Sequence, residues 1–191
     1  MEGRPLNEHD LILRVKSGDV AAFESLVETH QQIALRVAFL VVGDRTVAED
    51  VTQEAFVKAY HAISRFREDG VFRPWLLRIV RNEALNQRRR RGRQDRLSLR
   101  LANDTVSGGA APSPETTVIT AVERRAVIDA VSALSDRYRD VVTHRYLLGL
   151  TEAETAATLS IPIGTVKSRT ARALGQLQGS LGDLREEPRD E

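Results

Sequence analysis

A stretch with few large apolar residues divides the 191-residue chain and limits the folds that it can adopt. Residues 103–117 read NDTVSGGAAPSPETT, which is rich in Gly, Ser, Thr and Pro. Because such a segment buries too little apolar surface to offset the entropy lost on ordering, it predicts a flexible linker rather than part of a core. We therefore expect two domains, at 5–92 and 121–184, joined by a linker at 93–120.

The apolar residues on both sides of this linker recur at helical spacings, and no segment alternates like a strand. Gly18-Asp19 and Gly43-Asp44 predict breaks between the first helices. Thr46 and Glu49 have the spacing of a capping box, which predicts a helix start. The sequence therefore predicts an all-α protein of two small helical domains. In the last helix of the first domain, one apolar face is formed by Trp75, Ile79 and Leu85.

The composition argues against several functional classes. Cysteine is absent, so the chain has neither a disulfide framework nor a thiolate metal site. The four histidines, at positions 9, 30, 61 and 144, show no metal-ligand spacing, and we expect His61 and His144 at helix surfaces or edges. The sequence contains no phosphate-binding loop or nucleophile motif. We therefore expect that the protein is not an enzyme and binds no cofactor. No apolar run has the length of a signal peptide or a membrane span, which predicts a cytoplasmic protein without membrane insertion.

The net charge of +1 conceals two basic segments. Seven arginines lie between Arg88 and Arg100, against the single acid Asp95. A smaller basic group surrounds Lys167 and Arg172. Any one of these arginines is consistent with ordinary solvated surface. Seven in thirteen positions, together with the second basic group, indicate that the protein binds a polyanion at two separate sites.

Residues 151–172 have the layout of a helix-turn-helix. Thr151 and Glu154 form a capping box, Ser160-Ile161 predicts a tight turn, and Pro162 suits the first turn of the next helix. We expect Gly164 to allow close packing, since it has no Cβ. The inward-facing residues are expected to be Ala156 and Leu159 on the first helix, and Val166 and Leu174 on the second.

The second of these helices carries polar and small residues on its other face, where a helix-turn-helix enters the DNA major groove. Lysine and arginine there can reach phosphates or guanine edges, and a serine can bond either. An ordinary helical hairpin is the alternative. The candidate contact residues on this face are Lys167, Ser168, Ala171 and Arg172.

The first half adds two features that a simple DNA-binding protein does not need. The segment EDVTQEAFVKAYHAI places Asp50, Gln53, Glu54 and Lys58 around the surface of an amphipathic helix, although a solvated helix face would look the same. Phe66, Phe72 and Trp75 then surround a charged, glycine-containing loop. We expect Phe72 and Trp75 in the core and Phe66 at the loop edge, where it could stack on an unpaired base for ~1–3 kcal/mol. Asn82 and Asn86 lie one helical turn apart, and their amides suit base edges or a solvated face.

Together these residues resemble the extracytoplasmic-function (ECF) sigma factors of bacterial RNA polymerase. The resemblance covers about 11–91 and 122–181. It rests on three motifs in the family's order: DVTQEAFVKAY, then F-x5-F-x2-WL-x2-I-x2-N, then GLT-x-x-E-x-A followed by IPIGTVKSR. Two independent blocks separated by a linker of suitable length make the match specific.

The resemblance implies roles for the first domain, which corresponds to sigma region 2. One helix is implied to bind the clamp of the polymerase, and the loop after it to capture a flipped base of the minus-ten element. Many relatives carry Asp at the position of Asn86. The implied polymerase-binding residues are Asp50, Val51, Gln53, Glu54 and Phe56. The implied minus-ten residues are Lys58, Phe66, Arg67, Glu68, Asp69, Asn82 and Asn86.

The second domain corresponds to region 4, which in the family reads the minus-thirty-five element. Thr155 departs from the pattern, since relatives carry an apolar residue there. The family's linker runs toward the RNA exit path, which Arg96 and Arg100 would suit. The implied minus-thirty-five residues are Arg145, Thr165, Lys167, Ser168, Ala171 and Arg172.

The function implied by the resemblance is that of an alternative sigma factor. Its partners would be the beta and beta-prime subunits of core RNA polymerase, promoter DNA and an anti-sigma factor. The alternative is a helix-turn-helix regulator that does not bind core polymerase. That alternative leaves the DVTQEAFVKAY block and the aromatic loop without a purpose.

Overall fold

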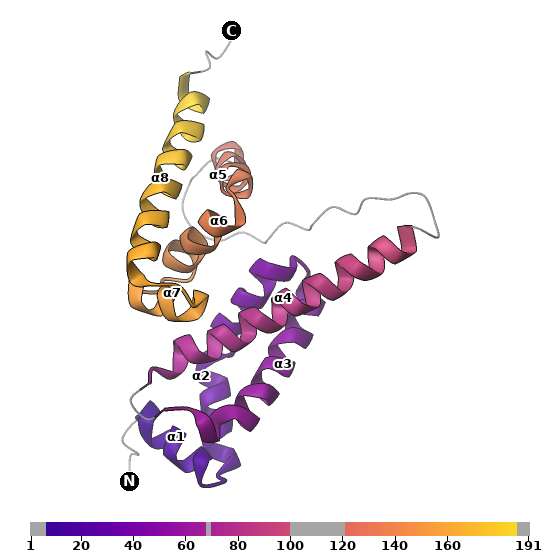
Figure 1. Ribbon diagram of the computed structural model, residues 1–191, viewed down its shortest axis with the longest axis vertical. Helices are drawn as coiled ribbons and strands as arrows, with labels where there is room; N and C mark the ends of the chain where they lie inside the picture. Colours follow the sequence, from indigo (N-terminus) through magenta and orange to yellow (C-terminus); the bar gives the residue numbers. More distant parts are fainter. Residues whose placement is uncertain (1–6, 68–69, 100–120, 187–191) are drawn as a thin grey trace. The chain divides into compact units, whose positions relative to one another are not determined.

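The computed structural model describes residues 7–67, 70–99 and 121–186, and every regular element in these ranges is helical (Figure 1). This confirms the predicted all-α class. The chain divides into two compact units, 1–111 and 112–191, with the division inside the predicted linker. Each unit has its own core and is described by itself.

The first unit is a bundle in which three long helices pack against one another. Its elements are α1 (Glu8–Lys16), α2 (Val20–Val42), α3 (Arg45–Ala62), the short 3₁₀ turn η1 (Ile63–Arg65) and α4 (Phe72–Leu99). Helices α2, α3 and α4 contact one another pairwise, and α1 packs against α2. The core between them is lined by Leu26, Val37, Val51, Leu76 and Val80, all 3% exposed or less.

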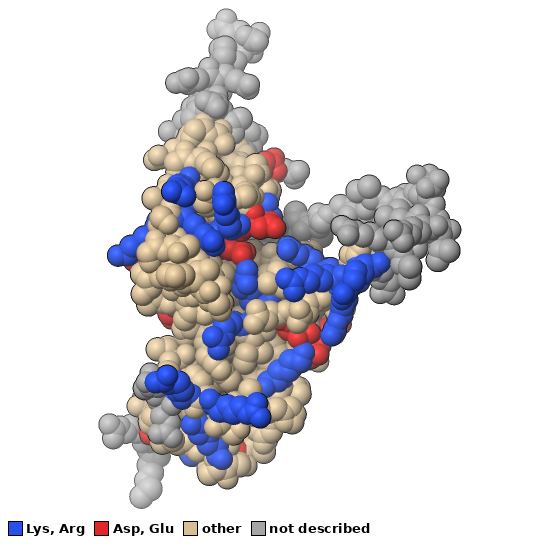
Figure 2. Space-filling model, in the orientation of Figure 1, with Lys and Arg blue, Asp and Glu red and all other residues tan. Residues whose placement is uncertain are grey.

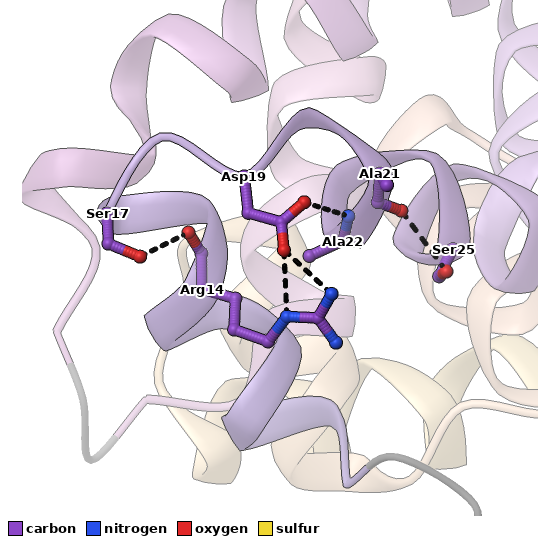
Figure 3. A network of polar contacts seen from close by, with 6 residues as sticks. All are labelled: Arg14, Ser17, Asp19, Ala21, Ala22 and Ser25. Carbon is purple, nitrogen blue, oxygen red and sulfur yellow. Dashed lines mark hydrogen bonds and ion pairs between the residues drawn. The ribbon is translucent and has the colours of Figure 1, made fainter. Parts of the chain in front are cut away.

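The α1–α2 corner shows how local polar contacts begin a helix (Figure 3). Asp19 caps α2, because its Oδ1 accepts the backbone N–H of Ala22 at 3.1 Å. Its Oδ2 accepts Nε and Nη2 of Arg14 at 2.9 and 2.7 Å. These hydrogen bonds, that of Arg14 first, lower the pKa of Asp19 below its ordinary value. The bonds therefore stabilise the corner above that ordinary pKa, and the contribution is lost as the pH falls through the lowered one.

The α2–α3 corner confirms one predicted helix break and corrects a predicted cap. Gly43 ends α2 in the left-handed conformation, with φ 73°, and Asp44 caps α3 by accepting the N–H of Val47 at 3.0 Å. The predicted start at the Thr46–Glu49 capping box is therefore wrong. The reason is that an aspartate is also a strong N-cap and stands two residues earlier, directly after the glycine.

The buried face of α4 differs from the predicted one. Trp75, Ile79 and Leu85 are only partly buried. Both α2 and α3 pack against α4, and the deeply buried stripe that they cover lies beside these three residues. Its members are Phe72, Leu76, Leu77, Val80 and Ala84, all 0% exposed.

Helix α4 also extends further than the sequence predicts. It continues to Leu99, so residues 93–99 of the predicted linker are helical. The arginines and leucines of this segment are good helix formers, and the helix-breaking composition begins only at 103. The rest of the predicted linker, with Arg100, lies outside the described residues.

The second unit consists of four helices and a π-helical turn. They are α5 (Ala121–Ala133), α6 (Asp136–Val142), the π-helical segment η2 (Thr143–Leu147), α7 (Glu152–Leu159) and α8 (Ile163–Glu186). Helix α8 packs against α5, α6 and α7. A central cluster joins α5, α6 and α8, and it contains Leu134, Tyr138, Val142 and Ala173, with Leu177 against it.

Two expected packing roles in α8 are wrong, and one expected surface position is buried. Val166 is fully buried as predicted, but Leu174 is 38% exposed, and Ala173 is the buried residue. Seven residues make almost two whole helical turns, so 173 rather than 174 returns to the face of Val166. A Cβ on Gly164 would meet no atom within 4 Å, so that glycine is not needed for packing.

The residue that was expected at a helix surface but is buried is His144 of η2. It is 3% exposed, since it lies one turn after the buried Val141.

The turn between α7 and α8 holds Ser160 in the left-handed conformation, with φ 56°. Among the described residues it is the only non-glycine with positive φ. Because a Cβ costs about 1–2 kcal/mol in this region, Ser160→Gly is expected to raise the free energy of unfolding of the second unit by about 1 kcal/mol. Urea unfolding followed by circular dichroism measures this. Gly149, with φ 63°, is the control, since Gly149→Ser should lower stability; an unchanged midpoint for Ser160→Gly would contradict the assignment of strain.

Candidate functional site

Helix α3 separates the predicted polymerase-binding residues into two groups. Asp50, Gln53 and Glu54 are exposed and form one polar surface. Val51 and Phe56 are 3% and 7% exposed and pack into the bundle. A partner that approaches this helix therefore meets two carboxylates and an amide, while the apolar pair holds the helix in place.

An ion-pair network of three side chains connects α3 to α4. Nζ of Lys58 lies 2.9 Å from Oε1 of Glu54 and also donates to Oε2 of Glu83. Glu83 belongs to α4 and is only 4% exposed, whereas the Lys58 side chain is 45% exposed. The bond to Glu83 and then that to Glu54 raise the pKa of Lys58. The bond from Lys58 lowers the pKa of Glu54. The ammonium group of Lys58 is thus paired with two carboxylates of the protein, although the side chain remains 45% exposed.

The motifs did not single out Glu83. A signal was present, because this acid lies in the otherwise apolar buried stripe of α4, between Val80 and Ala84. A buried carboxylate needs a partner, and a lysine on a neighbouring helix is a natural one. The periodicity of the sequence alone does not say which lysine is near.

The residue that precedes the loop before α4 packs against two aromatic rings of that helix. Phe66 is 5% exposed, with its ring centroid 5.0 Å from that of Trp75 and 5.9 Å from that of Phe72. The expectation that Phe66 lies open at the loop edge is therefore wrong. The cause is the 3₁₀ turn η1, which ends at Arg65 with Phe66 as its C-cap and leaves the Phe66 ring in contact with the first turn of α4.

The two ends of the loop differ in how much they can vary. A Cβ on Gly70 would lie 3.0 Å from the Arg67 carbonyl oxygen and from the Phe66 ring, so a larger residue requires these neighbours to shift by a few tenths of an ångström. Arg67 is exposed, and Glu68 and Asp69 lie outside the described residues. On α4 itself, Asn82 and Asn86 are both exposed on one face, as predicted.

The second unit presents the expected recognition helix. The capping box is confirmed: the Glu154 N–H donates to Oγ1 of Thr151 at 3.2 Å, and the Thr151 N–H donates to Oε2 of Glu154 at 2.8 Å. Pro162 immediately precedes α8, and its carbonyl accepts the N–H groups of Thr165 and Val166. The residues of α8 exposed beyond this turn include Lys167, Ser168, Ala171 and Arg172.

Comparison with known proteins identifies the family to which the chain belongs. The Sigma-70 region 2 family matches residues 26–94, and the Sigma-70, region 4 family matches residues 124–177. The ECF RNA polymerase sigma-E factor of Escherichia coli (strain K12) is 38% identical over 187 residues, which cover 94% of this chain and 96% of that protein. The chain belongs to the ECF sigma factors. The RNA polymerase sigma-H factor of Pseudomonas aeruginosa is 35% identical over 183 residues, 93% of this chain and 95% of that protein.

Two solved structures resemble the chain over most of its length. CnrH, solved in complex with the cytosolic domain of CnrY, superposes with a TM-score of 0.66 at 27% identity and covers 92% of this chain and 97% of that one. The sigma factor RpoE of Bartonella quintana, solved with the anti-sigma factor NepR, has a TM-score of 0.64 at 26% identity. That match covers 85% of this chain and 98% of RpoE.

Several region 4 residues of this sigma factor have partners inside the protein. Arg145 is half-buried, and its Nη1 donates to the Leu150 carbonyl, so it braces the turn before α7. Nζ of Lys167 lies 3.6 Å from Oε2 of Glu152, an exposed and therefore easily exchanged pair. Thr165 is half-buried.

The departure at Thr155 has a visible consequence. Thr155 is 0% exposed, and its hydroxyl has no hydrogen-bond partner. A buried hydroxyl without a hydrogen-bond partner destabilises a core, so Thr155 lowers the stability of the second unit relative to an apolar residue of similar size.

The described part of the sigma factor was also compared with the requirements of a metal site and of a membrane span. No three His, Cys, Asp or Glu side chains within it come together as metal ligands. None of the described helices combines the length and the apolar character that crossing a membrane requires.

Proposed function

We propose that this chain is an alternative sigma factor that directs core RNA polymerase to specific promoters and promotes their melting. The observation that carries the proposal is the exposed Asp50–Glu54 surface of α3, on a unit separate from the helix-turn-helix. A DNA-binding regulator needs only the recognition helix and leaves this surface without a partner. The chain acts in the cytoplasm, with the beta and beta-prime subunits and promoter DNA, and is not an enzyme by itself.

In this proposal the first unit binds both the polymerase and the minus-ten element. Asp50, Gln53 and Glu54 contact the clamp, while Val51 and Phe56 support them from the core. Asn82 and Asn86 hold the melted strand. The loop residues Arg67, Glu68 and Asp69 select a flipped base, and the cost of flipping, a few kcal/mol, is offset by the pocket that receives it. Lys58 is exposed but paired with Glu54 and Glu83, and Phe66 is buried, so in this proposal both support the minus-ten surface from behind.

The second unit is proposed to read the minus-thirty-five element. Lys167, Ser168, Ala171 and Arg172 form the contact face, and the exposed arginine is best placed for a bidentate contact with guanine. Thr165 and Arg145 support this face at the helix start and at the preceding turn.

An anti-sigma factor is the proposed regulator. RpoE, which resembles this chain, was solved with the anti-sigma factor NepR bound, and CnrH was solved with the cytosolic domain of CnrY bound. We infer that a comparable protein covers the polymerase-binding surface of this chain.

Reconstitution with core polymerase tests the function. The full chain is mixed with core enzyme, and run-off transcription is measured on genomic promoters. We expect promoter-specific transcripts that core enzyme alone does not make. A chain that binds promoter DNA but neither co-purifies with core enzyme nor supports transcription would favour the regulator instead.

Arg172→Ala tests the recognition helix. If Arg172 makes a bidentate contact with a base, its loss should cost ~1–3 kcal/mol of binding and relax the preference at one position of the minus-thirty-five element. The measurement is promoter binding by holoenzyme over a set of minus-thirty-five variants. If Arg172 contacts only phosphate, all sequences weaken alike and the salt dependence becomes flatter, which would contradict a reading role.

A further inference from the structure

One of the three polar residues on the exposed surface of α3, Glu54, has its side chain held in place by the protein. Its Oε1 lies 2.9 Å from Nζ of Lys58, which stands one helical turn further along α3. The Glu54 side chain is nevertheless 50% exposed. Lys58 thus takes one oxygen of the carboxylate and leaves the other for a partner.

The hold on Glu54 is firmer than that of an ordinary surface pair. Lysine and glutamate one turn apart on an exposed helix normally interact weakly and exchange with water. Here Lys58 also donates to Oε2 of Glu83, a carboxylate of α4 that is only 4% exposed. In the described part of the chain no other cation lies within ion-pair distance of Glu83, and its Oε1 has no hydrogen-bond partner. Lys58 therefore cannot turn away from α4 without leaving a buried charge uncompensated.

Helix α4 also acts on Glu54 through charge. Figure 2 shows acidic side chains over α3 beside basic side chains over the C-terminal half of α4, and the two helices are in contact. The bond from Lys58, and to a smaller extent the charge of Arg90, lowers the pKa of Glu54. The carboxylate is therefore ionised at neutral pH, and its place on the surface is set by α4 through Lys58.

We propose that Glu83 is a positioning residue of the polymerase-binding surface: Lys58, anchored on Glu83, fixes the Glu54 carboxylate in the orientation that a cationic side chain of core polymerase meets. This rests on the proposed function, which assigns Glu54 to that surface. A free glutamate loses rotamer entropy when a partner orders it, and a side chain that is already ordered avoids this loss. Without the anchor, core binding should weaken about 2- to 12-fold, the range for ordering one flexible side chain.

The test is K58M/E83M, which removes one cation and one anion and so leaves the net charge of the chain unchanged. Methionine has a similar volume, and replacing a buried ion pair by apolar residues is often neutral for stability. Circular dichroism and urea unfolding first establish that the helices are intact. The affinity of the labelled full chain for core polymerase is then measured by fluorescence anisotropy. We expect binding to be about 2- to 12-fold weaker than that of the wild type.

Two further backgrounds separate positioning from a general effect on the fold. In Glu54→Ala no carboxylate remains to be held, so adding K58M/E83M should cause no further loss of core affinity. In Asp50→Ala the same addition should again weaken binding about 2- to 12-fold, because residue 50 lies about two helical turns from Lys58. A merely structural role of the pair would weaken binding by the same factor in all three backgrounds.

Two results would overturn the proposal. One is wild-type core affinity in K58M/E83M, and the other is a loss in the Glu54→Ala background as large as in the wild type. If the methionine pair does not fold, K58Q/E83Q repeats the cycle with the same net charge and the same expected losses. Failure of the wild-type chain to bind core polymerase would instead refute the proposed function.

Discussion

Replacing Lys58 with methionine is expected to lower the free energy of unfolding of the first unit by about 3 kcal/mol. The substitution leaves the Glu83 carboxylate 4% exposed without its cation. Breaking a buried ion pair from one side costs about 3–5 kcal/mol, and the lower end applies because the Lys58 side chain is 45% exposed and water reaches it. Urea unfolding of the full chain at pH 7, followed by circular dichroism, measures the change.

The same contacts determine how the stability contribution of Lys58 depends on pH and which variants serve as controls. The pKa of Lys58 is raised, so its contribution is complete at pH 7 and is lost only as the pH rises through the raised value. Glu54→Gln breaks only the exposed pair and should cost about 0–1 kcal/mol. The double variant K58M/E83M removes both charges and should recover most of the loss. If K58M alone unfolds at the wild-type midpoint, Glu83 does not depend on Lys58.

Asp50→Arg together with Gln53→Arg is expected to abolish co-purification with core polymerase. Both side chains are exposed and lie on the surface proposed to bind the clamp. Placing two cations where the proposed partner meets an acidic-polar surface costs several kcal/mol, or more than about 100-fold in affinity. Glu54 is left unchanged, because an arginine there would also repel Lys58.

The control for this experiment is a charge reversal on another helix. Glu28 is exposed on α2, so Glu28→Arg changes charge in the same unit without touching α3. It should bind core enzyme as the wild type does. Circular dichroism should show intact helices in all variants. Unchanged core binding by the α3 double variant would refute the clamp assignment and with it the main support for the proposed function.

The helices and their boundaries were largely predictable, because their signals are local. Gly43-Asp44 and the Thr151–Glu154 box end and begin helices through contacts within four residues. The capping error at Thr46 has the same origin, since two local signals competed and the earlier aspartate prevailed. The two-unit division likewise follows from composition, although how far α4 extends into the linker does not.

The parts of the site that the sequence misplaced depend on neighbours far along the chain. Phe66 is buried because Phe72 and Trp75 receive its ring, and no pattern within the loop reports this. Lys58 is satisfied by Glu83, 25 residues away on another helix. Arg145 turns inward to the Leu150 carbonyl. In each case the sequence identified a residue that matters but not the direction of its side chain.

The anchoring of the loop before α4 also bears on how such proteins diverge. Phe66 and Phe72 are buried on the two sides of the loop, and a Cβ on Gly70 would lie 3.0 Å from the Phe66 ring. Packing therefore constrains these three positions. If the loop selects a base as proposed, substitutions at Arg67, Glu68 and Asp69 are the changes expected to alter that choice. A duplicated gene would then gain a second promoter class by changing three codons.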